Sequence, residues 1–193
     1  MAMKVVAFNG SARKNGNTTN LLNIVLEEIK EQGGDIELVE LAGLNLSGCK
    51  ACYKCFENKD NCCAVDDDLI NEAIDKMRSA DGIILGSPTY FADVSANMKA
   101  FIERTGMVSR ANGDIYKRKV GASVVAVRRA GASHVFSSLN NFFLIGQMIL
   151  AGSSYWNIGI GKNPGEVLED AEGVKTMKDL GINMAWLINK IKE

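Results

Sequence analysis

Proline, histidine and net charge are all scarce in this sequence. Its 193 residues include two prolines and one histidine, and the formal net charge is −1. A nearly neutral chain exerts no long-range attraction on nucleic acid or on an anionic membrane, so we expect neither as a partner. No apolar run approaches the roughly 20 residues that cross a bilayer.

The side-chain sets that support hydrolysis are also missing. The single histidine, His134, begins an expected helix, where a capping or surface role suits it. No Ser-His-Asp set accompanies it, and no isolated pair of carboxylates suits sugar chemistry. We therefore expect no hydrolase, and we assign no catalytic side chain.

The amino terminus and the cysteines indicate where the protein works. Residues 1–4 lead directly into an apolar segment, which leaves no room for a signal peptide. We therefore expect a reducing, cytoplasmic location. In that setting the five cysteines crowded between Cys49 and Cys63 indicate metal or redox chemistry more than structural disulfides.

Short β-branched apolar segments alternate with longer segments of helical period along the chain. Strands are expected near residues 5–8, 36–41, 82–86, 120–127 and 153–158. Helices are expected over residues 18–32, 68–79, 95–105, 133–151 and 174–192. This alternation predicts a single α/β domain over residues 1–193, with a cysteine-rich segment at 48–66. Its five-stranded parallel sheet would have helices on both faces, as a three-layer sandwich.

The loop between the first strand and the first helix has the composition of a phosphate site. Such a site needs hydroxyl donors, a positive charge, backbone freedom and a helix N-terminus. The residues that supply these features are Ser11, Thr18, Thr19, Arg13, Gly10 and Gly16. The same composition also fits an ordinary βα turn. It matches neither a P-loop nor a Gly-x-Gly-x-x-Gly dinucleotide motif.

The run from Asn9 to Thr19 resembles the FMN-phosphate loop of the NAD(P)H-dependent FMN reductases, a branch of the flavodoxin-like proteins. The resemblance covers essentially the whole chain. It implies a flavodoxin-like fold with strand order 2-1-3-4-5 and bound FMN. The phosphate-loop residues that it implies are Ser11, Arg13, Gly16, Asn17, Thr18 and Thr19.

The loop after the third expected strand would face the same ligand. In this strand order, ligands lie at the carboxyl ends of strands 1 and 3. The Pro-x-Tyr pattern here, followed by residues 98–104, is typical of the family's isoalloxazine loop. The resemblance implies backbone N–H groups on the flavin edge and a flanking aromatic ring, although these aromatics also fit simple surface packing. The residues concerned are Pro88, Thr89, Tyr90, Phe91, Ala92 and Asp93.

A third loop follows the fourth strand and contains two adjacent arginines. In related proteins this loop contacts the other side of the flavin, which implies contacts from Arg129 and Gly131. The arginines could stabilise an anionic reduced flavin or bind the phosphates of a nicotinamide cofactor. They also fit solvated surface charges.

The cysteine spacing is the most informative local pattern. Cys49, Cys52 and Cys55 follow a C-x-x-C-x-x-C pattern, whose thiolates can bind adjacent corners of one cubane. Structural zinc more often uses two separated C-x-x-C pairs. The segment resembles the compact motif of the iron-sulfur flavoproteins, which implies a [4Fe-4S] cluster with Cys63 as fourth ligand. Cys62 is an alternative fourth ligand, and free redox-active thiols are an alternative to any cluster.

The resemblance implies an FMN-dependent oxidoreductase with NAD(P)H as electron donor. The acceptor would be a small molecule or a protein: free flavin, a quinone or an iron-sulfur centre. One alternative is an electron carrier that receives single electrons from a ferredoxin-like donor through the [4Fe-4S] cluster. Another is a flavin-binding sensor or structural module. The second half of the 133–151 segment is apolar on nearly all sides, which predicts a subunit interface in a homodimer or homotetramer.

Overall fold

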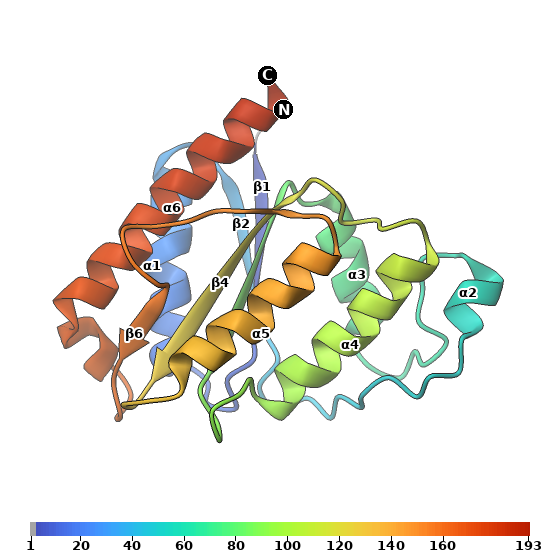
Figure 1. Cartoon of the computed structure of the whole chain (residues 1–193), viewed down its shortest axis with the longest axis horizontal. Helices are drawn as coiled ribbons and strands as arrows, with labels where there is room; N and C mark the ends of the chain where they lie inside the picture. Colours follow the sequence, from blue (N-terminus) through green and yellow to red (C-terminus); the bar gives the residue numbers. More distant parts are fainter. Residues whose placement is uncertain (1–2) are drawn as a thin grey trace.

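The computed structural model describes residues 3–193, and a parallel sheet lies at its centre (Figure 1). The strands are β1 (Lys4–Asn9), β2 (Asp35–Glu40), β3 (Gly82–Pro88), β4 (Val120–Val127), β5 (Ile149–Leu150) and β6 (Ile158–Ile160). Their order is β2-β1-β3-β4-β5, and β6 also pairs with β4. This order confirms the flavodoxin-like arrangement expected from the sequence.

Helices cover both faces of this sheet (Figure 1). They are α1 (Asn17–Glu31), α2 (Lys54–Asn58), α3 (Ile70–Ser79), α4 (Ala96–Ala111), α5 (Ala132–Ile145), α6 (Ala171–Lys192) and the 3-10 helix η1 (Glu166–Glu169). α1 and α6 pack on one face, and α3, α4 and α5 pack on the other. Among the helices formed by residues 3–193, none has both the length and the apolar character that spanning a membrane requires.

The sheet separates two hydrophobic cores because its side chains alternate between its faces. On β1, Val5 and Ala7 belong to the core under α1 and α6. Val6 and Phe8 belong to the core under α3, α4 and α5. This period of two, with both faces buried, is what a central parallel strand requires.

The region after β4 differs from the expectation. The helix expected over 133–151 ends at Ile145, and Gln147 has a positive φ of 55°. The strand expected at 153–158 is wrong. Instead, β5 pairs with the beginning of β4 and β6 pairs with its end, so two short strands share one edge.

Candidate functional site

A pocket of about 320 Å³ opens where β1, β3 and β4 end. Residues from the first and second expected loops line it together, although these loops are far apart in the sequence. The expected residues that line the pocket are Ser11, Arg13, Gly16, Asn17, Thr18, Pro88, Thr89 and Tyr90. The topology therefore places both loops at a common site.

Sequence reasoning missed part of the pocket wall. The additional lining residues are Ala126, Val127, Arg128, Gly161, Lys162 and Pro164. The apolar pattern predicted where β4 ends. The expected flavin contact, however, was assigned to Arg129, whereas Arg128 lines the pocket. The loop containing Lys162 follows β6. Because the last strand was expected at residues 153–158, this loop was not expected at the pocket.

The end of the pocket near α1 is suited to an anion. α1 begins after Gly16, which has no side chain to cap the helix, and the first turn contains no acidic residue. Backbone N–H groups at such a helix start attract negative charge. Arg13, Arg128 and Lys162 line the same pocket, and its lining contains no carboxylate. These features fit a phosphate group.

Asn9, at the end of β1, supports the first loop. Its Oδ1 accepts a hydrogen bond from the Ser11 N–H at 2.9 Å. Its Nδ2 donates to Thr19 Oγ1 at 2.9 Å and to Glu40 Oε2 at 2.8 Å. The Thr19 hydroxyl in turn donates to Glu40 Oε1 at 3.2 Å. Thr19, an expected phosphate contact, therefore belongs to the network behind the loop and does not line the pocket.

Close packing against α4 requires glycine at position 10. A Cβ at Gly10 would lie 2.7 Å from the Met98 Cβ. The Ser95 hydroxyl donates to the Gly10 carbonyl at 2.6 Å, and the Gly10 N–H donates to the Gly86 carbonyl at 2.8 Å. The first loop is thereby held to both β3 and the start of α4.

Most backbone N–H groups of the second loop are bonded within the protein. Tyr90 and Asp93 exchange two backbone hydrogen bonds of 3.0 Å each, and the Thr89 N–H donates to the Ala126 carbonyl at 2.8 Å. The expectation that every N–H group from Thr89 to Asp93 contacts the flavin is therefore wrong for these three. Within residues 3–193, the loop's N–H groups without a partner are those of Phe91 and Ala92.

The tip of this loop has a strained backbone. Phe91 and Ala92 have positive φ values of 48° and 62°, and the Phe91 side chain is fully exposed. Two consecutive non-glycine residues in this region are costly and occur most often at functional sites. The loop also contains a buried hydroxyl, Thr89 Oγ1, that has no hydrogen-bond partner among residues 3–193. Because Thr89 lines the pocket, this hydroxyl fits a polar ligand there.

The third loop lies beside this pocket instead of within it. Arg129 and Gly131 line an adjoining pocket of about 280 Å³, together with Tyr155 and Trp156. Gly131 has φ of 87°, and a Cβ there would lie 3.0 Å from the Ala92 Cα. The second and third loops are therefore in contact, although only Arg128 of the arginine pair lines the first pocket.

Asp93 also lies outside the first pocket and serves the loop itself. Its Oδ1 accepts hydrogen bonds from the Val94 N–H at 2.7 Å and from the Ser138 hydroxyl at 2.9 Å. Burial acts to raise the pKa of Asp93, but these hydrogen bonds outweigh it and the pKa is lowered. The exposed His134 lies 3.8 Å from its carboxylate, in agreement with a surface role for that histidine.

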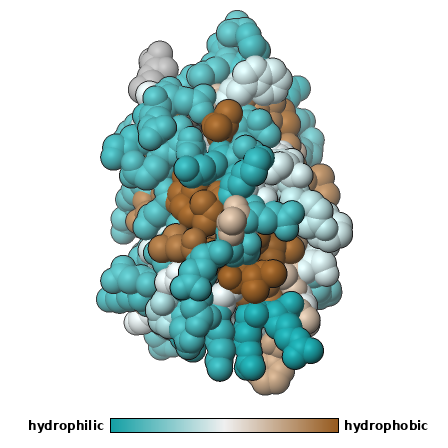
Figure 2. Space-filling model, turned by 90° about the vertical axis from the view of Figure 1, so that its left-hand side faces the viewer, coloured by the Kyte–Doolittle hydropathy of each residue, from teal (hydrophilic) through white to brown (hydrophobic). Residues whose placement is uncertain are grey.

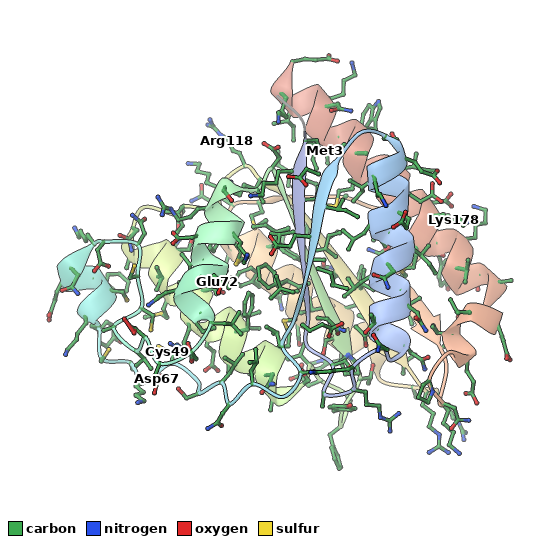
Figure 3. All side chains as sticks on the ribbon, turned by 180° about the vertical axis from the view of Figure 1, so that it is seen from behind. Met3, Cys49, Asp67, Glu72, Arg118 and Lys178 are labelled. Atoms are coloured by element: carbon green, nitrogen blue, oxygen red, sulfur yellow. The ribbon has the colours of Figure 1, made fainter. Side chains whose placement is uncertain are left out.

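A second cavity lies between the cysteine-rich segment and α4. Cys49, Cys52, Cys55 and Cys63 all line it, and Cys62 is not among its lining residues. Cys49 is labelled on this segment in Figure 3, and the cavity lining contains residues from both ends of the segment, Gly48 and Val65. The segment therefore closes on itself and brings four thiols to one cavity.

Left-handed backbone conformations make this closure possible. Ala51 and Tyr53, the two neighbours of Cys52, have φ values of 49° and 56°. The short α2 follows, a helix that the sequence pattern did not predict. Burial raises the pKa of Cys55, backbone hydrogen bonds oppose this, and the charges of Cys63 and Cys49 raise it further. The thiols are thus close enough to influence one another.

The adjacent Cys62 and Cys63 differ in their hydrogen-bond partners and in the charges near them. Asn71 binds both backbone groups of Cys63, accepting from its N–H at 2.7 Å and donating to its carbonyl at 3.0 Å. Arg104 Nε donates to the Cys63 Sγ at 3.4 Å. For Cys62, burial raises the pKa first and the nearby Asp60 carboxylate raises it further. Cys63 therefore suits a negatively charged sulfur ligand better than Cys62 does.

The cysteine cavity is small, about 20 Å³, and is lined by four thiols. Across residues 3–193, no three Cys, His, Asp or Glu side chains are close enough together to hold one metal ion. Zinc requires such a compact set, whereas the irons of a cubane are bound by thiolates at separate corners. Four thiols are the donor set that a [4Fe-4S] group uses, so the chemistry of the lining fits such a group.

Comparisons with known proteins show the family of this chain. Residues 3–163 match the model of a family described as NADPH-dependent FMN reductase. The chain is 38% identical to an iron-sulfur flavoprotein of Methanocaldococcus jannaschii, covering 99% of this chain and 100% of that protein. It is 33% identical to an iron-sulfur flavoprotein of Methanosarcina thermophila, covering 99% and 98%.

A solved structure supports the fold. The chain superposes on the crystal structure of RosB, which contains a bound riboflavin-phosphate derivative, with a TM-score of 0.79. The alignment covers 99% of this chain and 81% of RosB at 16% identity. At this identity the likeness establishes a shared architecture.

Proposed function

The chain belongs to the NADPH-dependent FMN reductase family and is an FMN-dependent oxidoreductase, and from this premise we propose how its two sites work. The pocket at the ends of β1, β3 and β4 binds FMN, and the cysteine cavity holds a [4Fe-4S] cluster, all within one domain of residues 1–193. When bound, FMN accepts a pair of electrons and returns them singly, while the cluster carries one electron at a time.

In the FMN site, the phosphate binds at the start of α1. The first backbone N–H groups of that helix, with Arg13, Arg128 and Lys162, neutralise its charge. The Thr89 hydroxyl, buried and without a protein partner, donates to the flavin or its ribityl chain. Phe91 and Ala92 present the two N–H groups that are available for the polar edge of the ring.

In the cluster site, the ligands are Cys49, Cys52, Cys55 and Cys63. The observation that carries this assignment is that these four thiols line one cavity and Cys62 does not. All five cysteines are free, so the four lining thiols are available as ligands. The protein then exchanges electrons between a nicotinamide or ferredoxin-like donor and a small-molecule or protein acceptor.

Anaerobic kinetics with each donor test this assignment. We expect NADH or NADPH to be oxidised with saturation, because hydride transfer to a bound flavin requires a nicotinamide complex. An electron carrier would instead be reduced rapidly by a ferredoxin and show no nicotinamide saturation. A holoprotein that neither donor reduces would contradict both versions and favour a sensor or structural module.

We further propose that the protein is a homodimer or homotetramer. Leu144 and Ile145, at the end of α5, are 58% and 65% exposed. A second hydrophobic area appears in Figure 2 on the side where α6 lies, and Ile182 of α6 is 43% exposed. Two separate apolar surfaces of this kind suit an assembly of identical subunits.

Substituting Ile145 by aspartate tests the α5 surface. We expect I145D to lower the molar mass measured by light scattering at micromolar concentration, because a carboxylate in an apolar interface loses its hydration. Asn23→Asp, at an exposed position of α1, adds the same charge and should leave the mass unchanged. A wild-type protein that is already a monomer would contradict the proposal.

A further inference from the structure

Arg104 of α4 is a buried arginine whose contacts all lead to one short segment. Its side chain is 1% exposed. Nε donates to the Cys63 Sγ at 3.4 Å, Nη2 donates to the Val65 carbonyl at 2.5 Å, and Nη1 pairs with the Asp68 carboxylate. The guanidinium thus binds a thiol, a carbonyl and a carboxylate within residues 63–68. This is the segment that supplies the proposed fourth cluster ligand.

The contact with sulfur is the unusual one. A carboxylate and a carbonyl would be enough to anchor a loop to a buried arginine. A neutral thiol is only a weak acceptor, whereas a thiolate or a cluster-bound sulfur is a strong one. The Nε–H aimed at Cys63 would therefore stabilise negative charge on this sulfur.

The two adjacent residues of α4 hold opposite ends of the cysteine segment. Glu103 Oε2 accepts a hydrogen bond from the Cys49 N–H at 3.3 Å. Arg104 holds Cys63, whose backbone is also fixed by Asn71. One turn of α4 therefore positions both the first and the last cysteine of the proposed ligand set.

We propose that Arg104 positions Cys63 as the fourth ligand and raises the reduction potential of the [4Fe-4S] cluster, with Asp68 opposing the second effect. This inference rests on the cluster assigned above. Reduction adds one negative charge, so a cation and an N–H donor at a ligand sulfur favour the reduced state. The Asp68 carboxylate, 10% exposed and paired with the far side of the guanidinium, partly cancels that charge.

Two substitutions are expected to shift the potential in opposite directions. Arg104→Gln removes the positive charge and should make the cluster harder to reduce. Asp68→Asn removes the opposing negative charge and should make it easier to reduce. The amide oxygen in the Asp68→Asn variant can still accept the hydrogen bond that Asp68 Oδ1 accepts from the Ile70 N–H at 3.1 Å. If the ion pair had only a structural role, the two substitutions would not shift the reduction potential in opposite directions. Removing either partner would then disturb the same packing.

The experiment is an anaerobic redox titration of the holoprotein, followed by electron paramagnetic resonance of the reduced cluster. Iron and FMN per chain are measured on the same samples. We expect each substitution to change the reduction equilibrium about tenfold, or ~59 mV for a one-electron couple. Arg110→Gln, the same change at a half-exposed arginine of α4, should shift nothing. If Arg104→Gln retains too little iron to titrate, the proposal is tested by Asp68→Asn alone, whose cluster should have a higher reduction potential than that of the wild type.

The possible failures of this test are distinguishable. Wild-type protein that contains no iron overturns the cluster assignment and this inference with it. Wild-type protein with a cluster, but with Asp68→Asn unshifted or shifted downward, overturns only the role of Arg104 and Asp68. Equal shifts in Arg104→Gln and Arg110→Gln would likewise show that burial against Cys63 is irrelevant.

Discussion

Replacing Cys63 by serine is expected to reduce the iron content from about four per chain to less than about one. The same replacement at Cys62 is expected to leave the iron content unchanged. Serine has nearly the shape of cysteine but is a poor ligand for iron at neutral pH. The paired substitutions therefore compare neighbouring positions that differ in their access to the cavity.

The structure provides three reasons for this difference. Cys63 lines the cavity with the other three thiols, and Cys62 does not. Arg104 donates to the Cys63 sulfur, whereas burial and then the Asp60 carboxylate raise the pKa of Cys62 and disfavour its thiolate. Asn71 fixes the backbone of Cys63 from both sides. A thiolate ligand is therefore favoured at one position and disfavoured at the next.

Iron and acid-labile sulfide, measured on anaerobically purified variants, check this prediction. FMN content and thermal unfolding serve as controls for the fold, since the FMN pocket and the cysteine cavity share no lining residue. Loss of iron in C62S with retention in C63S would make Cys62 the fourth ligand and contradict the assignment. Full iron in both variants would contradict four-cysteine ligation.

Asn17→Asp is expected to weaken FMN binding by about 100-fold, because it adds a negative charge beside the proposed phosphate position. Asn17 is the first residue of α1 and lines the pocket. Its Oδ1 accepts a hydrogen bond from the Gly165 N–H at 2.8 Å, which an aspartate can also accept. Aspartate at a helix start also favours the helix itself. The substitution thus changes charge with little change of shape.

Titration of apoprotein with FMN and with riboflavin measures the effect. Riboflavin lacks the phosphate, so its affinity should be equal in wild type and Asn17→Asp. The loss for FMN should shrink at high salt, and also below about pH 6, where a phosphate monoester takes up a proton. Asn23→Asp, further along α1 and exposed, is the matched control. Equal losses for FMN and riboflavin would place the phosphate elsewhere.

The sequence predicted the fold class because alternating local patterns determine it, whereas the two sites stay predictions. Alternating β and α segments imply a parallel sheet, and its loops meet at one edge. The strand order and the flavin chemistry expected from the resemblance are confirmed. The cysteine spacing predicts a cluster, and the structure brings Cys49, Cys52, Cys55 and Cys63 to one cavity.

What the sequence did not predict depends on contacts between distant segments. Arg104 is 41 residues from Cys63, and no spacing rule connects them. Thr19 is adjacent to Thr18, but its hydroxyl turns to a network with Asn9 and Glu40 that only packing reveals. Lys162 enters the pocket through a loop whose position depends on β6, a strand too short to have a clear pattern.

Anaerobic purification, followed by a visible spectrum and assays of flavin, iron and sulfide, tests the central claim most directly. We expect flavin bands with a broad shoulder near ~400 nm, about one FMN, and about four irons and four sulfides per chain. Flavin without iron would contradict the cluster and leave a flavin reductase with free thiols. A colourless protein that does not bind added FMN would contradict the account as a whole.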